Sequence, residues 1–214
     1  TALPAGPKQR RGEDDKPESV PNKMRICHVI ESSSGGSSRV VVDLLRDQID
    51  AGHEVTLIYS PVRAEPQLTD AIAAFGDRLR VRTIPMSRAV RPQDLVSASK
   101  LLRELWKLGP FDVVHGHSSK AGALSRIAGI FLGKTVMVYT PHAFATLAPD
   151  AARIYGAAEW GASWFSDAIL LGSQQEYAHA RDALHLPVSR LHLIRPGVDL
   201  SIVSDRATAR RSLG

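Results

Sequence analysis

Residues 24–59 read MRICHVIESSSGGSSRVVVDLLRDQIDAGHEVTLIY, and this stretch decides the fold class. An apolar run is followed by a turn rich in serine and glycine, then by an amphipathic segment and a second apolar run. Val41, Leu44 and Leu45 recur at the three- and four-residue intervals of one helix face. Gly52 stands where a helix-terminating glycine is expected. The pattern predicts a strand, a helix and a second strand.

The same alternation continues along the rest of the chain. Strands are predicted at 25–30, 55–60, 80–84, 112–117, 135–140, 168–171 and 191–194, and helices near 38–51, 65–75, 92–108, 119–132, 151–165 and 174–184. Several of the strand segments are apolar without polar alternation, which is typical of a parallel sheet covered by helices on both faces. The sequence therefore predicts a doubly wound, Rossmann-like α/β domain.

Composition excludes several classes of protein. The chain has 214 residues, is 43% hydrophobic and carries a net charge of +5, as expected of a globular protein. Its one cysteine, Cys27, excludes an intramolecular disulfide and fits a cytoplasmic location. No uncharged apolar run reaches the roughly 20 residues of a membrane-spanning helix. No basic stripe alternates with aromatic residues, so no nucleic-acid partner is expected.

The first 23 residues differ from the rest in composition. They contain four prolines, mixed charges and almost no apolar periodicity. Such a segment buries too little apolar surface to offset the entropy lost on ordering. We therefore expect residues 1–23 to be a flexible leader and residues 24–200 to form the folded domain.

The first candidate site follows the first strand. In a doubly wound sheet, ligands bind outside the carboxyl ends of the strands. Gly35, Gly36 and Arg39 belong to the turn that leads into the first helix, where free N–H groups and the helix dipole favour an anion. The turn lacks both the dinucleotide and the P-loop glycine patterns. A capped serine-rich loop without a ligand is the alternative interpretation.

Histidines lie at the end of the fourth strand and just after the fifth. Alternation places His115 and His117 on one face of the fourth strand. A metal would need a third ligand, which only His142 offers, so no metal is expected. The alternatives for His117 are ligand contact and hydrogen bonding within the sheet. His142 can donate to a sugar hydroxyl or phosphate or move a proton, and the alternative is a turn histidine.

Ser173 follows the sixth strand and stands three residues before Glu176. This spacing predicts a capping box at the start of a helix. We therefore interpret Ser173 as structural first and as a residue that lines the ligand site second.

At these residues the chain resembles glycosyltransferases of the GT-B fold, family 4, whose members are mostly retaining. The ordered matches are Met24–Ile30 with Gly35 and Gly36, Ala51–Val55, Asp112–Gly122, Val138–Phe144 and Gly197–Asp199. The resemblance covers residues 24–214. It implies the N-terminal, acceptor-side half of a two-domain enzyme, in which the second domain holds the nucleotide-sugar donor.

The resemblance also implies roles for individual residues. His142 would be the catalytic residue in contact with the transferred sugar, and the glycine turn would approach the diphosphate. The acceptor side would be lined by His117, Ser118 and Lys120. The acceptor would be a saccharide or a lipid-linked saccharide, with no cofactor besides the donor. A peripheral contact with the inner face of a membrane is expected through 92–107, unless core packing explains its apolar stripe.

The chain ends at Gly214, where the first strand of a donor domain would begin in such enzymes. Residues 201–214 would then start the linker to that domain, and the family's Glu-x7-Glu segment has no counterpart here. Half of the groups that stabilise the transition state would be missing, so this chain by itself is expected to fold but to transfer no sugar. The alternatives are a nucleotide-sugar epimerase of similar fold and a non-catalytic module that binds a phosphorylated metabolite.

Overall fold

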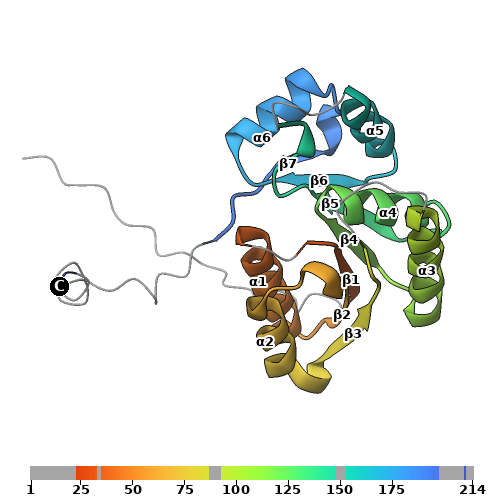
Figure 1. Ribbon diagram of the computed structural model, residues 1–214, viewed down its shortest axis with the longest axis vertical. Coiled ribbons are helices and arrows are strands. Elements are labelled where there is room, and N and C mark those ends of the chain that lie inside the picture. Colours follow the sequence, from red (N-terminus) through yellow and green to blue (C-terminus); the bar gives the residue numbers. More distant parts are fainter. Residues whose placement is uncertain (1–22, 33–34, 87–92, 148–152, 198–209, 211–214) are drawn as a thin grey trace, which may run out of the picture.

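The computed structural model describes residues 23–32, 35–86, 93–147, 153–197 and 210 (Figure 1). Seven strands form one sheet in the order β3-β2-β1-β4-β5-β6-β7, and every neighbouring pair is parallel. The strands are β1 (Arg25–Ile30), β2 (Glu54–Tyr59), β3 (Leu79–Thr83), β4 (Val113–His117), β5 (Val136–Thr140), β6 (Ala168–Leu171) and β7 (Leu191–Leu193). The predicted doubly wound sheet is confirmed.

Helices connect the strands and cover both faces of the sheet. They are α1 (Gly36–Asp50), α2 (Pro66–Phe75), α3 (Gln93–Leu108), α4 (Ser119–Gly129), α5 (Arg153–Ser163) and α6 (Gln174–Ala178), the last continued by a π-helical turn at His179–Ala183. Figure 1 shows α1 and α2 on one face, with α3 and α4 on the other. Residues 1–22 of the leader predicted at 1–23, and all of 201–214 except Arg210, lie outside the described residues.

The burial of apolar side chains explains why the helices pack where they do. Val41 and Leu45 of α1 are fully buried against Leu57 of β2, as the periodicity predicts. Gly52 adopts a φ of 87° immediately after α1, which confirms it as the residue that ends the helix. Each fully buried leucine contributes about 1.5–3 kcal/mol to folding.

A close contact between glycine and tyrosine sets the position of α4. A Cβ atom on Gly122 would overlap the ring of Tyr139 in β5, and one on Gly116 of β4 would lie 2.8 Å from the Cα of Gly122. Only glycine at these two positions lets α4 approach the sheet so closely. The first turn of α4 is thereby held against the carboxyl end of β4.

The apolar stripe of α3 belongs to the core. Leu101 and Leu105 are each 1% exposed and pack with core residues of β4 and α4. Core packing therefore explains the apolar stripe of this helix. These two leucines are buried, so they are not available for the expected membrane contact. Trp106 remains on the surface, with 60% of its area exposed. Within the described residues, no helix combines the length and apolar character needed to cross a bilayer.

Candidate functional site

The residues predicted to form the site lie at one edge of the sheet. Strands β1, β4, β5 and β6 are consecutive and parallel, so their carboxyl ends share that edge (Figure 1). The elements there place Gly36 at the start of α1, His117 at the end of β4, His142 just after β5 and Ser173 just before α6. These residues lie close together because of the order in which the strands pair. The sequence near each residue does not specify that order.

At the glycine turn, the Glu65 carboxylate of the same chain occupies the position where an anionic ligand was expected. Gly35 has a φ of 60°, a conformation that L-residues with side chains rarely adopt. Its N–H donates to Oε2 of Glu65 at 3.0 Å. Arg39 lies one turn further on, half-exposed, with its Nε 3.8 Å from Oδ2 of Asp43. An exposed pair of this kind adds little stability, so Asp43 does not prevent Arg39 from meeting a ligand.

Four side chains form a hydrogen-bonded chain beneath the edge. Nε2 of His28 lies 2.7 Å from Oε1 of Gln48 on α1, and Nδ1 of His28 lies 2.9 Å from Nε2 of His117. Nδ1 of His117 in turn lies 3.0 Å from Nε2 of His142. We call Gln48, His28, His117 and His142 the histidine chain. It runs from α1 through β1 and β4 to the residue that follows β5.

Burial keeps these imidazoles neutral. Burial lowers the pKa of His28 to about 4, although the bond to Gln48 acts in the opposite direction. Burial likewise lowers the pKa of His142 to about 4. The pKa of His117 is well below its ordinary value because the ring is buried and because a proton on His115, His28 or His142 would repel its charge. Near neutral pH each ring therefore has one N–H donor and one acceptor nitrogen.

His115 lies beside the histidine chain but has its own partner. Its Nε2 is 2.8 Å from Oγ1 of Thr140, and its ring centroid is 3.9 Å from that of His117. Ring nitrogens of His28, His115 and His117 lie within 4.8 Å of one another, so the expectation that only His142 could be a third metal ligand was wrong. However, the His28 and His117 nitrogens are hydrogen-bonded to each other, and the His115 ring lies against that of His117 at an interplanar angle of 35°. The geometry favours a hydrogen-bonded cluster over a metal centre.

Strained backbone conformations gather at the same edge. Ser118, His142 and Ala143 have φ values of 68°, 51° and 82°. Such conformations cost about 1–3 kcal/mol each in residues other than glycine and occur preferentially at functional sites. Glu176 secures this backbone, because its Oε1 accepts from the Ala143 N–H at 2.6 Å and its Oε2 from the Gly172 N–H at 2.9 Å.

The remaining predicted residues have local roles as well. Ser173 caps α6, since its Oγ accepts from the Glu176 N–H at 3.1 Å, which confirms the structural half of that prediction. The Oγ of Ser118 is buried and has no partner among the described residues. Lys120 lies in the first turn of α4. Ligand contact by Ser118, Lys120 and Ser173 stays a prediction.

Sequence reasoning missed His28, Gln48 and Glu176 as parts of the site. The alternation of side chains along β1 could have identified His28. It precedes Ile30 by two residues and therefore lies on the same face of the strand. The register pairs Ile30 with His117 and His28 with His115, so all four side chains share one face of the sheet. That face is covered by α1, because Ile30 packs with Val41 of this helix. Gln48 follows Leu44 by four residues on α1, and its polar end bonds to His28.

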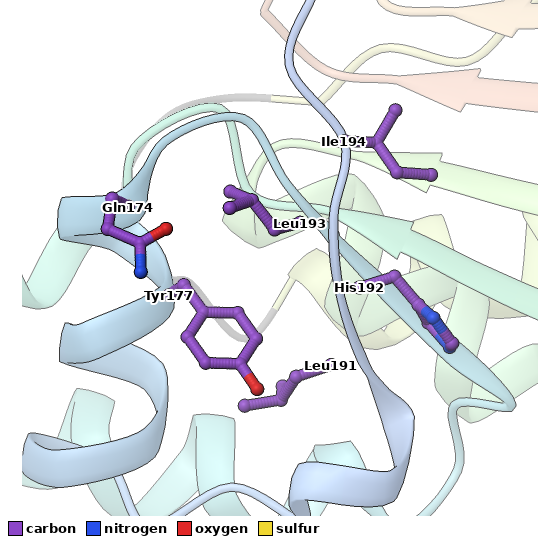
Figure 2. Close-up of a pocket in the computed structure, with 6 residues that line it drawn as sticks. All are labelled: Gln174, Tyr177, Leu191, His192, Leu193 and Ile194. Atoms are coloured by element: carbon purple, nitrogen blue, oxygen red, sulfur yellow. The ribbon is translucent and has the colours of Figure 1, made fainter. Parts of the chain in front are cut away.

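A separate hollow lies beside the edge strand β7 (Figure 2). Its volume is about 460 Å³, and its lining consists of Gln174, Tyr177, Leu191, His192, Leu193 and Ile194. Figure 2 shows Tyr177 of α6 directed toward Leu191. None of the predicted site residues lines this hollow, so it is distinct from the carboxyl-edge site.

Comparison with known proteins gives the family. The family model of Glycosyltransferase Family 4 matches residues 34–202. A UDP-Gal:alpha-D-GlcNAc-diphosphoundecaprenol alpha-1,3-galactosyltransferase of Escherichia coli is 37% identical over 78 residues, which are 36% of this chain and 19% of that protein. The match to the family model covers most of the chain.

Solved structures share the fold. HepE of Anabaena in complex with UDP superposes with a TM-score of 0.66 at 15% identity, over 89% of this chain and 50% of HepE. A UDP-N-acetylglucosamine 2-epimerase superposes with a TM-score of 0.54 at 12% identity, over 80% of this chain and 48% of the epimerase. The chain thus spans about half the length of these proteins. The matched family model and the parallel sheet together assign the chain to Glycosyltransferase Family 4, as the N-terminal, Rossmann-like half of a GT-B fold.

Proposed function

We propose that this domain is the acceptor-side half of a retaining glycosyltransferase that moves a sugar from a nucleotide-sugar donor to a saccharide or lipid-linked acceptor. The observation that carries the proposal is the histidine chain, which ends in His142 at the carboxyl edge of a family 4 domain. The glycine turn at Gly35 shares this edge. An anion-binding turn and a neutral imidazole on one edge suit a diphosphate next to a sugar.

The relatives support a uridine nucleotide as donor. The HepE structure contains UDP, and the Escherichia coli relative is named for UDP-Gal and a diphosphoundecaprenol-linked acceptor. We therefore propose a UDP-sugar as the donor and a cytoplasmic location, with no cofactor besides the donor. The free thiol of Cys27 fits that location.

In the proposed reaction the diphosphate meets the N-terminus of α1. The N–H of Gly35 would exchange the Glu65 carboxylate for a phosphate oxygen, a like-for-like substitution of one anionic acceptor by another. The departing diphosphate would help to deprotonate the acceptor hydroxyl on the same face of the sugar, which retains the anomeric configuration. His142 would contact the transferred sugar, with Ser118 and Lys120 on the acceptor side.

Replacing His142 by alanine tests this proposal in the complete natural polypeptide that contains these residues. We expect kcat/KM for transfer from a UDP-sugar to fall about 10- to 100-fold, because a hydroxyl of the transferred sugar loses its hydrogen-bond partner in the site. The affinity for UDP should change little, since the diphosphate meets α1 instead. Transfer is measured with labelled UDP-sugars, and the anomeric configuration of the product is read by NMR.

Two controls accompany this experiment. His192→Ala alters an exposed histidine on β7 and should leave transfer unchanged. Residues 1–214 alone should show no turnover, because relatives of this fold are about twice as long. An active His142→Ala enzyme would contradict the assignment of His142, and robust turnover by residues 1–214 would contradict the two-domain proposal.

The epimerase alternative shares the fold but has no residue-level support here. At 12% identity, the epimerase structure shows similarity of fold alone. The second alternative, a non-catalytic module that binds a phosphorylated metabolite, likewise has no residue-level support. Conversion of a UDP-sugar to its epimer without any acceptor would favour the first of these alternatives over transfer.

We also propose a peripheral membrane contact, in keeping with the lipid-linked acceptor of the Escherichia coli relative. Its surface would centre on Trp106 and Phe131, which are 60% and 58% exposed and joined by a 3.3 Å bond from the indole Nε1 to the Phe131 carbonyl. Lys107 adjoins them on α3. Exposed aromatic side chains beside basic ones favour the interface of an anionic bilayer.

Trp106→Glu should reduce sedimentation with liposomes that contain anionic lipid, because it removes an apolar anchor and adds a repelled charge. The matched control is Val62→Glu, at a residue that is 59% exposed on a different connection. Equal binding by both variants, or no binding by the wild-type protein at low salt, would contradict the membrane contact.

A further inference from the structure

We infer that Gln48, His28 and His117 are positioning residues that hold His142 in its Nε2–H tautomer, leaving Nδ1 as an acceptor for a substrate hydroxyl. The identification of that hydroxyl as part of a sugar rests on the proposed function. The tautomer itself depends only on the hydrogen bonds of this domain.

The direction of the chain is set at its buried end. Gln48 presents its carbonyl oxygen Oε1 to Nε2 of His28 at 2.7 Å. A carbonyl oxygen accepts hydrogen bonds and cannot donate them, so Nε2 of His28 carries the proton. In a neutral ring the other nitrogen then has a lone pair, which makes Nδ1 of His28 an acceptor.

The same logic passes along the two remaining bonds. Nδ1 of His28 accepts at 2.9 Å from Nε2 of His117, so this nitrogen of His117 carries its proton. Nδ1 of His117 is then an acceptor, and at 3.0 Å it receives the proton of His142 Nε2. His142 Nδ1 is left unprotonated, and it has no hydrogen-bond partner among the described residues.

Burial fixes the direction of the hydrogen bonds in this chain. His28 and His117 are both 0% exposed, so water does not compete for their nitrogens. A reversed link would leave two donors or two acceptors facing each other in the interior, which costs about 1–3 kcal/mol for each unsatisfied group. His115 stays outside the chain, because its Nε2 bonds to Thr140.

The main chain of the neighbouring residue is also held. The Glu176 carboxylate accepts from the Ala143 N–H, which prevents the loop from turning the ring of His142 away from His117. The ring is thus held through its side chain by His117 and through the adjoining backbone by α6.

The tautomer determines what His142 recognises. A lone pair on Nδ1 accepts from hydroxyl and amide donors, whereas phosphate oxygens without protons offer only acceptors. The acceptor nitrogen would therefore select a hydroxyl group of the ligand, and the diphosphate would have to bind elsewhere. The Gly35 N–H on the same edge is a donor and suits that second part of the ligand.

Nitrogen NMR of residues 1–214 tests the tautomer directly, with His142→Ala to assign its signals. At neutral pH we expect His142 Nε2 to resonate in the range of a protonated ring nitrogen and Nδ1 in that of an unprotonated one. Addition of zinc should leave the spectrum unchanged. The opposite tautomer, or a ring averaged between both, would overturn the inference.

A variant that reverses the terminal group gives a second test. Gln48→Lys replaces the acceptor by a donor, so His28, His117 and His142 should all switch to the Nδ1–H tautomer. Gln48→Met, which offers neither, should give averaged signals. Gln175→Lys introduces the same charge on the exposed side of α6 and should leave His142 as in the wild type. An unchanged His142 tautomer in folded Gln48→Lys would overturn the role of Gln48.

The kinetic consequence is measured in the complete natural polypeptide. Gln48→Lys should lower kcat/KM about ten-fold, the equivalent of one lost hydrogen bond, without weakening the binding of UDP. An equal loss in Gln175→Lys would show that charge alone is responsible and would overturn the inference. If the wild-type polypeptide transfers no sugar, the proposed function fails, while the tautomers remain measurable.

Discussion

Glu159→Ala is expected to lower the free energy of unfolding by about 3–5 kcal/mol, because it strands a buried guanidinium. Oε2 of Glu159 on α5 lies 3.0 Å from Nη2 of Arg126 on α4, and the Arg126 side chain is 2% exposed. Oε1 of Glu159 accepts from the hydroxyl of Tyr139 at 3.0 Å. The total stability of a domain is about 5–15 kcal/mol, so the loss would be a large fraction of it.

Arg126 cannot recover the lost interaction elsewhere. Its Nε already donates to the carbonyl of Gly122 at 3.0 Å, and its guanidinium lies 4.0 Å from the centroid of the Tyr139 ring. Nη1 of Arg126 is buried without a partner among the described residues even in the intact protein. The truncated carboxylate would therefore leave a second unsatisfied nitrogen in the interior.

Urea unfolding monitored by circular dichroism measures this loss. The matched control is Asp50→Ala, which removes an exposed pair of similar length, with Arg78 Nη1 3.1 Å from Asp50 Oδ1. Exposed pairs contribute about 0–1 kcal/mol, so the control should be near the wild type. Equal losses in the two variants would refute the argument from burial.

Acid is expected to destabilise the domain through its buried histidines. The pKa of His28 and of His142 is about 4 in the folded protein, against the ordinary value of 6.5. Between about pH 6.5 and pH 4 these histidines are therefore protonated in the unfolded chain but not in the folded protein. Stability is complete above about pH 6.5 and declines as the pH falls toward 4. His115 and His117 act in the same direction.

The slope of this decline is measurable. Two such histidines give up to about 2.7 kcal/mol per pH unit once the unfolded chain is protonated, and the other two steepen it. Urea midpoints at a series of pH values provide the slope. His28→Gln should reduce it by about 1.4 kcal/mol per pH unit, since one fewer proton is taken up. A free energy of unfolding that stays constant from neutral pH to pH 5 would contradict neutral burial of these rings.

Hydrophobic patterning was sufficient to predict the fold. The helix after β1 was readable from Val41 and Leu45, and Gly52 marked its end, because these signals depend only on neighbours along the chain. The leucines of α3 were harder to interpret. One apolar stripe is equally suited to a core and to a membrane, and only packing against β4 and α4 shows that Leu101 and Leu105 are used internally.

The sequence predicted the site residues at the carboxyl ends of the strands but not the buried residues beneath them. His117 and His142 stood out because His117 ends a strand and His142 follows the next one, and the parallel sheet brings their rings into hydrogen-bonding distance. His28 lies in the middle of β1, where nothing local separates a buried packing residue from a member of a polar chain. Glu176 was recognised as a cap, while its second carboxylate oxygen bonds to Ala143, 33 residues away.

The amino-acid sequence by itself determined the order of strands and helices, the turn at Gly35 and the family to which the chain belongs. Those properties follow from side-chain periodicity and from backbone preferences within a few residues. The tertiary structure alone decided that Gln48, His28, His117 and His142 join into one chain. Their contacts depend on which strands pair and in what register, and that choice is made by the packing of segments far apart in the sequence.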